Sequence, residues 1–149
     1  MSSIFNKTDA DQFVRRIAHL TPISQHMWGT MTVSQMLAHI QQPIKVALGE
    51  IEPKQSFAGY LFGRLIKKRI INEKPFNKEL PTDPSFVVKN ERNFDSEKQY
   101  AIDLIQRLNV AATQHVQNRK HPIFGKLSVE EWDVLTVKHL DHHLRQFGV

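Results

Sequence analysis

The chain has 149 residues, no cysteine and a formal net charge of +5. This length suits one domain with its own core, so we expect a single domain over residues 1–149. The lack of cysteine excludes disulfides and protein thiolate chemistry. The lack of an apolar run of about 18 residues or of a secretory leader in MSSIFNKTDADQF predicts no membrane span and a cytoplasmic location.

The apolar periodicity is helical along the whole chain, with no convincing alternating strand. A first helix is expected from about Asp9 to Leu20, with Thr8 as its N-cap. A second helix begins at Thr32-Val-Ser-Gln35, a capping box in which each side chain satisfies a free backbone N–H. Gly49 is its expected stop. Pro43 lies inside this helix and is expected to kink it, because proline removes one backbone hydrogen bond.

A long crossover follows the second helix. A shorter amphipathic helix is expected within it from Phe57 to Ile71 after a Ser56 cap, and then an irregular, proline-containing stretch from Asn72 to Phe94. Much of the positive charge lies in RLIKKRIINEK, from Arg64 to Lys74. Such a run is more often the solvated face of a helix than a patch for phosphate, a membrane surface or a homodimer partner. It holds no nucleic-acid reading motif, so specific nucleic-acid binding is not expected.

Two further helices are expected near the carboxyl end. One follows an Asp95 cap, with an apolar stripe from Tyr100 to Val116. After a loop that carries His121 to Gly125, a second capping box, Ser128-Val-Glu-Glu131, opens the final helix.

Connection lengths predict how the four main helices are arranged. The first two and the last two are each joined by roughly ten residues, which favours antiparallel neighbours. The long crossover allows the second and third main helices to run in the same direction. The predicted fold class is therefore all-α, an up-down-down-up four-helix bundle with an extra short helix in the crossover.

The final helix carries the clearest chemical signal. On a helical wheel His139 and His143 lie about 40° apart at the centre of the apolar face, with Trp132 and Gln146 each about 20° from His139. Burial of two polar rings costs free energy unless their nitrogens are paired or ligated. A histidine pair on a buried helix face is typical of a metal site built inside a helical bundle, so the pair is a candidate for one.

A catalytic zinc-type site usually takes three protein ligands and leaves one position for water or substrate. The best third candidate is His39, at the border of the second helix's apolar stripe. The absence of a glutamate directly after His139 argues against a zincin-type protease. The other histidines are poorer candidates because they lie in or near loops and helix ends: His19, His26, His115 and His121.

The alternative is that the pair consists of core histidines without a metal. Their nitrogens would then be hydrogen-bonded to neighbours such as Gln146, Thr136 or Asp133. The pattern alone leaves both interpretations open.

Three stretches resemble a known family. They are WGTMTVSQMLAH from Trp28 to His39, PTDPSF from Pro81 to Phe86, and the carboxyl-terminal part from His121 to Trp132 and from Lys138 to Gly148. On these residues the chain resembles the DinB-like superfamily, in the branch catalogued as a domain of unknown function, DUF1569. The resemblance covers nearly the whole length, and the last stretch is the most specific.

The resemblance implies an up-down-down-up four-helix bundle with a divalent metal held by three histidines. Carried over to this sequence, the metal ligands are His39, His139 and His143, the residues that the helical wheel also selects. Better-known relatives resemble thiol-dependent S-transferases and isomerases that use bacterial low-molecular-weight thiols.

The favoured function is therefore a metal-dependent enzyme that acts on a small molecule, with Zn²⁺ or Ni²⁺ as the ion and a low-molecular-weight thiol as a second cofactor. A metal-dependent hydrolase and a non-enzymatic metal-binding or interaction module are the alternatives. Trp28 and Trp132 are candidates to line the pocket, and Gln146 is a candidate to orient a ligating histidine. Because ligating histidines must be deprotonated, metal affinity is expected to fall below a pH of about 6.5.

Overall fold

The computed structural model describes residues 2–54, 57–72, 74–78, 82, 84–111, 113–117 and 119–149. The chain is mostly helical with a very small sheet, so the all-α expectation holds at this level. The elements in chain order are α1 (Lys7–Ala18), α2 (Val33–Leu48), α3 (Phe57–Ile70), the 3₁₀ turn η1 (Pro84–Phe86), α4 (Phe94–Val110), α5 (Thr113–Val116), β1 (Lys120–His121), β2 (Gly125–Lys126) and α6 (Val129–Gln146).

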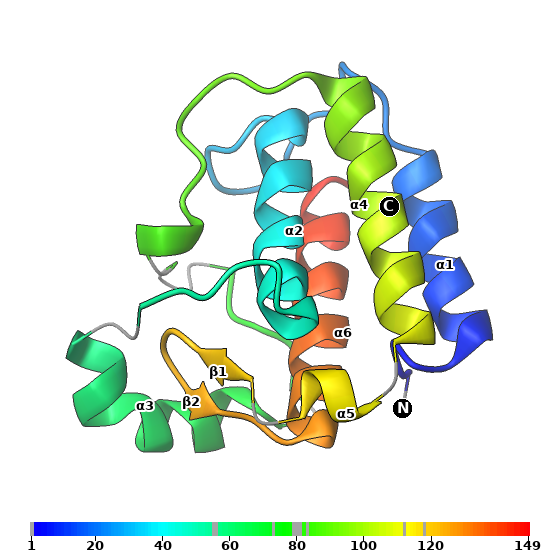
Figure 1. The fold of residues 1–149 in the computed structure, drawn as a ribbon. Coiled ribbons are helices and arrows are strands. Elements are labelled where there is room, and N and C mark those ends of the chain that lie inside the picture. Colours follow the sequence, from blue (N-terminus) through cyan, green and yellow to red (C-terminus); the bar gives the residue numbers. More distant parts are fainter. Residues whose placement is uncertain are drawn as a thin grey trace.

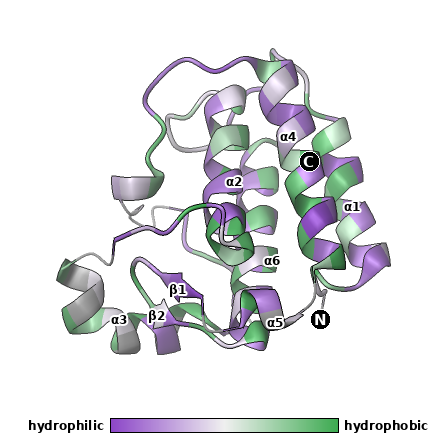
Figure 2. Ribbon diagram, viewed as in Figure 1, coloured by the Kyte–Doolittle hydropathy of each residue, from purple (hydrophilic) through white to green (hydrophobic). Residues whose placement is uncertain are grey.

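The helices α1, α2, α4 and α6 lie side by side, and α3, α5 and the β1–β2 hairpin gather toward one end of them (Figure 1). α2 packs on α4 and α6, and α1 packs on the same two helices. Hydrophobic and hydrophilic residues alternate around α1 and α4 (Figure 2), as expected for helices with one face in a core. Fully buried residues from all four helices form that core, among them Ile17, Met36, Leu37, Leu104 and Leu144.

Both predicted capping boxes are confirmed. The Thr32 hydroxyl accepts from the Gln35 backbone N–H at 3.2 Å, and the Gln35 side chain accepts from the Thr32 N–H at 3.0 Å. Ser128 and Glu131 make the same reciprocal pair at the start of α6. Gly49 ends α2 in the left-handed region, as predicted. α2 continues through Pro43, and the kink stays a prediction.

Two predicted N-caps are wrong. Asn6 caps α1 in place of Thr8, and Asn93 caps α4 in place of Asp95. Asparagine caps as well as threonine or aspartate. Each helix therefore starts slightly earlier, and the aspartates Asp9 and Asp95 lie in the first turn, where the positive end of the helix dipole stabilises them.

The segment between α4 and α6 also differs from the prediction. The long helix expected to reach Val116 ends at Val110, and a separate short helix follows it. The expected loop at His121 to Gly125 is an antiparallel hairpin, with His121 paired to Gly125. Strands of two residues are too short to leave an alternating pattern, and so sequence analysis missed them.

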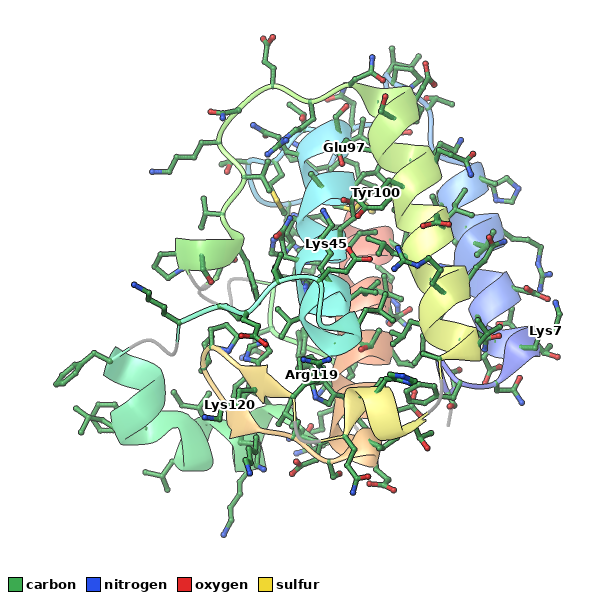
Figure 3. The ribbon with its side chains drawn as sticks, in the orientation of Figure 1. Lys7, Lys45, Glu97, Tyr100, Arg119 and Lys120 are labelled. Atoms are coloured by element: carbon green, nitrogen blue, oxygen red, sulfur yellow. The ribbon has the colours of Figure 1, made fainter. Side chains whose placement is uncertain are left out.

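The outer surface of α2 and α4 explains why Tyr100 is not in the core. Its side chain was predicted to join the apolar stripe of α4, yet it is 38% exposed. The Lys45 ammonium lies 4.6 Å from the centre of the Tyr100 ring, and the Tyr100 hydroxyl donates to Glu50 (Figure 3). A polar hydroxyl and a cation–π contact keep this ring at the surface.

The helix α3 lies against the hairpin because two glycines permit close approach. A Cβ at Gly59 would meet the Pro122 carbonyl oxygen at 2.5 Å, and one at Gly63 would collide with the Ile123 carbonyl oxygen. The predicted Ser56 cap of α3 lies outside the described residues. Among those that are described, no helix combines the length and low polarity that a bilayer crossing needs.

The basic segment from Arg64 to Lys74 contributes to an ion pair within the fold. Lys67 pairs with Glu131 at 2.8 Å, whereas Lys68 is exposed. Phe57, Leu61 and Leu65 leave an apolar edge of α3 in solvent. The side chains of Arg64 and Arg69 lie outside the described part of the chain.

Candidate metal centre

Three histidines converge where α2 packs on α6. His39 comes from α2, and His139 and His143 come from α6. One nitrogen from each lies within 4.8 Å of the other two, and the Nε2 atoms of His39 and His139 are 3.0 Å apart. His39 and His143 are buried, and His139 keeps some exposure. The structure thus brings together the three residues that the sequence selected.

A hydrogen bond to a backbone carbonyl shows which nitrogen of His39 carries the hydrogen. Its Nδ1 lies 2.9 Å from the backbone carbonyl oxygen of Phe86 in η1. A carbonyl oxygen can only accept, so Nδ1 carries the hydrogen and donates it. The neutral ring then presents the Nε2 lone pair to the cluster. Such a carbonyl partner is the usual way in which proteins fix a ligating imidazole.

A chain of two hydrogen bonds orients His143 in the same manner. The Gln146 Nε2 donates to the Trp28 carbonyl oxygen at 2.7 Å, which fixes the amide so that Oε1 faces His143. This Oε1 lies 2.8 Å from His143 Nδ1, which must therefore be the donor. His143 Nε2 remains as the lone-pair nitrogen. Gln146 is thus hydrogen-bonded to one of the three histidines, and its role in orienting a metal ligand stays a prediction.

The donor set fits a divalent transition metal. Zinc binds imidazole nitrogens at about 2.0–2.1 Å in tetrahedral geometry, which separates two ligand nitrogens by about 3.3 Å. The 3.0 Å separation between the Nε2 atoms of His39 and His139 is close to that value, and one nitrogen from each of the three histidines lies within 4.8 Å of the others. Neutral imidazoles suit zinc, nickel, copper and iron, so the cluster could hold several ions.

Burial keeps these imidazoles neutral. It is the largest cause of a lowered pKa at all three, and the like charge of neighbouring histidines adds to it. The pKa of His143 falls to about 3, and the pKa of His139 lies well below its usual value. The lowered pKa values move the expected loss of metal affinity to a pH below 6.5, and the pH dependence itself stays a prediction.

The cluster opens onto an inner cavity of about 100 Å³. Apart from the histidines, the cavity wall is mostly apolar and comes from the crossover, the hairpin and α6: Ile70, Phe76, Phe86, Ile123, Phe124 and Leu135. A largely apolar cavity beside the three histidines favours an uncharged group and strengthens electrostatic interactions there.

Two more histidines, which the helical pattern did not select, line this cavity: His121 and His142. His121 is 5% exposed and stacks on Phe124 with ring centres 4.5 Å apart. Its Nδ1 accepts backbone N–H groups of Ile123 and Phe124 at 3.2 and 3.4 Å. His142 lies 4.9 Å from His143, ring centre to ring centre. A prediction of the hairpin would have been needed to find His121.

The two tryptophans occupy different places. Trp132 is 1% exposed and packs near His121 in the core. It lines neither the inner cavity nor a second, larger groove, which lies between α1, α6 and residues 75–78. Trp28 lines that groove and lies 5.7 Å from His142. Trp132 is thus a core residue and Trp28 lines a groove, and a part for either in ligand binding stays a prediction.

The alternative partners suggested for the pair are partly seen. Gln146 does bond His143, whereas the Asp133 carboxylate accepts the Ile4 backbone N–H at 2.7 Å. Asp133 thus ties the amino-terminal segment to α6 and is not a partner of the cluster.

Gln146→Ala is expected to weaken metal binding by about 10–100-fold, because outer partners of this kind carry that much of the affinity. The loss of the amide frees His143 to rotate and leaves its buried Nδ1 without an acceptor. Competition titration against a chromophoric chelator measures the change. Gln25→Ala, at an exposed glutamine that bonds only a neighbouring carbonyl, is the matched control and should bind like wild type. Equal affinity in Gln146→Ala and wild type would exclude this orienting role.

These features define a mostly helical protein with a buried cluster of three histidines that could hold a metal ion. The family model described as "Protein of unknown function (DUF1569)" matches residues 4–148, and the chain belongs to that family. No curated protein and no solved structure matches the chain.

Proposed function

We propose that the protein is a divalent-metal-dependent enzyme whose ion is held by His39, His139 and His143, with Zn²⁺ or Ni²⁺ as the ion. The observation that carries the proposal is the convergence of three neutral imidazole nitrogens beside an apolar cavity. The proposal includes an up-down-down-up four-helix bundle and kinship with the DinB-like superfamily. Packing of α1 and α2 on both α4 and α6 supports the bundle.

A bound divalent ion would supply Lewis acidity that lowers the pKa of a coordinated thiol or water. The chain's own residues prepare the site for that chemistry. Phe86 and Gln146 fix two of the imidazoles, so that their lone pairs are oriented before a ligand arrives. Phe76 and Phe124 line the inner cavity, and their rings would shield a reacting group there from water.

Within this proposal, thiol transfer is the favoured reaction. The chain has no cysteine, so a reacting thiol comes from a low-molecular-weight cofactor. The apolar inner cavity suits the apolar body of an uncharged alkyl or aryl halide, in which the C–S bond would form as the carbon–halogen bond breaks and halide leaves, with the thiol proton passing to solvent. A metal-dependent hydrolase is the alternative reaction, since the same centre can activate water. The remaining alternative is a module that binds a metal or small ligand without turnover.

The test of the proposal loads the protein with Zn²⁺ and then measures catalytic turnover. Untagged, Zn²⁺-loaded protein is expected to conjugate a small thiol to an apolar electrophile faster than the His39→Ala variant by a factor of about 100 or more. The same preparations are assayed against ester and amide substrates. Turnover of these in place of conjugation identifies a hydrolase. Metal binding without turnover across both panels supports the binding module and rejects the enzyme.

A further inference from the structure

A second, larger cavity lies beside the inner one. It is a groove of about 510 Å³ between α1, α6 and the segment Pro75–Lys78. Phe13 of α1, Trp28 and Phe76 give it aromatic walls. Its size suits a small organic molecule, and the proposed function makes no use of it.

The groove and the inner cavity share part of their walls. Phe76 and His142 line both. The His142 ring lies 5.7 Å from Trp28 and 5.9 Å from Phe76, both groove residues, and 4.9 Å from His143 of the histidine cluster. One imidazole thus separates the groove from the candidate metal centre, and a molecule in the groove would have its end near that centre.

The groove carries excess positive charge. Its charged residues are the cations Arg16, Lys78, Lys138 and Arg145 and the carboxylates Asp9 and Asp141. The single carboxylate of Asp141 pairs with both Arg16 and Arg145 at 2.9 Å, and Arg16 also donates to the Val149 oxygen at 2.9 Å. In the part of the chain that the structure describes, Lys78 has no carboxylate partner, and its ammonium lies 4.8 Å from the centre of the Trp28 ring.

Lys138 contributes charge without being a free donor. Its ammonium donates to backbone carbonyls of Ile70 and Asn72 and lies 4.7 Å from the Phe76 ring. It anchors the wall of the groove, and Arg16 is bonded to Asp141 and Val149, so among the described lining residues Lys78 and Arg145 are the cations left to meet a ligand. Arg145 engages Asp141 through Nε, which leaves its terminal nitrogens available for a carboxylate.

We propose that this groove is a second ligand site, which binds the carboxylate end of an organic molecule whose uncharged end passes the Phe76–His142 wall into the inner cavity. Lys78 and Arg145 meet the carboxylate, and the aromatic walls hold the apolar body. The reach into the inner cavity rests on the proposed function, whereas carboxylate binding in the groove does not. Either the thiol cofactor or the substrate carries the carboxylate.

The experiment uses ω-mercaptocarboxylic acids of increasing chain length and ω-mercaptoalcohols of the same lengths as probes. Each is titrated into Co²⁺-loaded protein, and thiolate-to-cobalt absorption reports binding without turnover. Beyond a threshold length the acids are expected to bind about 10-fold more tightly than the matched alcohols. Lys78→Met and Arg145→Met should each remove most of that preference. Lys89→Met, at an exposed lysine that lines neither cavity, is the matched control and should keep it. Equal affinity of acids and alcohols at every length would overturn the proposal.

A titration without metal distinguishes failure of the groove site from failure of the metal centre. Calorimetric titration of the apo protein with the S-methyl derivatives of the same acids should give binding that Lys78→Met weakens and Lys89→Met does not. This result supports the groove site even if cobalt does not bind, in which case the metal centre alone fails. An apo protein that binds these acids no better than S-methyl alcohols rejects the groove site.

In the Co²⁺ form, a free-thiol acid that binds more tightly than its S-methyl derivative assigns the carboxylate to the thiol cofactor. Equal affinity assigns it to the substrate.

Discussion

His139→Ala is expected to abolish the stabilisation by Zn²⁺ that the wild-type protein shows. A ligand that binds only the folded state adds about 2.7 kcal/mol to the free energy of unfolding at a free concentration of 100 times its Kd. Without His139 the ion has two imidazoles in place of three, and the Nε2 atom 3.0 Å from His39 is gone. Urea unfolding with and without Zn²⁺ measures the difference, and elemental analysis of untagged protein gives the stoichiometry.

The matched control is His115→Ala, at an exposed histidine on α5 outside the cluster. It should keep the full metal-dependent gain. Metal-free stabilities are compared separately, because removal of a buried polar ring also changes packing. A wild-type protein whose unfolding and metal content match those of His139→Ala would end the metal-centre proposal.

Acidification from pH 7 to pH 5 is expected to destabilise the metal-free protein by at least about 2 kcal/mol. The pKa of His143 is lowered to about 3 in the folded state, whereas an unfolded histidine titrates near 6.5. Below pH 6.5 the unfolded chain binds a proton that the folded chain does not, so the free energy of unfolding falls. At pH 5 this linkage costs about 2 kcal/mol for His143 alone, and the loss stops growing near pH 3. The pKa values of His39 and His139 are also lowered, and both act in the same direction.

Urea unfolding of the apo protein at several pH values measures this dependence. His143→Gln should lose about 2 kcal/mol less than wild type between pH 7 and pH 5, because the proton-binding site of the unfolded state is gone. His115→Gln should keep the wild-type dependence. An identical loss in wild type and His143→Gln would show that His143 is not held neutral by burial.

The charge that lines the groove does not follow the charge pattern of the sequence. The most basic stretch of sequence, Arg64 to Lys74, contributes Lys67 to an ion pair with Glu131. The cations that converge on a cavity, Lys78 and Arg145, lie far apart in the chain and belong to no basic run. Charge density along a sequence therefore differs from charge density on a binding surface.

The predictions that the structure confirmed depend on local sequence patterns. The capping boxes at Thr32 and Ser128 set where α2 and α6 begin, because each box satisfies backbone donors within four residues. The inward face of His139 and His143 followed from the 3.6-residue repeat, which needs no knowledge of the neighbours. The predicted N-caps were wrong where neighbouring residues are equally good caps, as at Asn6 and Asn93.

The sequence by itself determined that this protein is mostly helical and that a histidine pair lies on a buried helix face, since both depend on contacts within a few residues. Only the tertiary structure decided that the Nε2 atoms of His39 and His139, 100 residues apart, lie within 3.0 Å. It also decided that the Phe86 carbonyl orients His39 and that a hairpin carries His121 to the cavity. These arrangements come from packing between distant segments. Such packing depends on the shape and volume of side chains across the whole core, which no local pattern encodes.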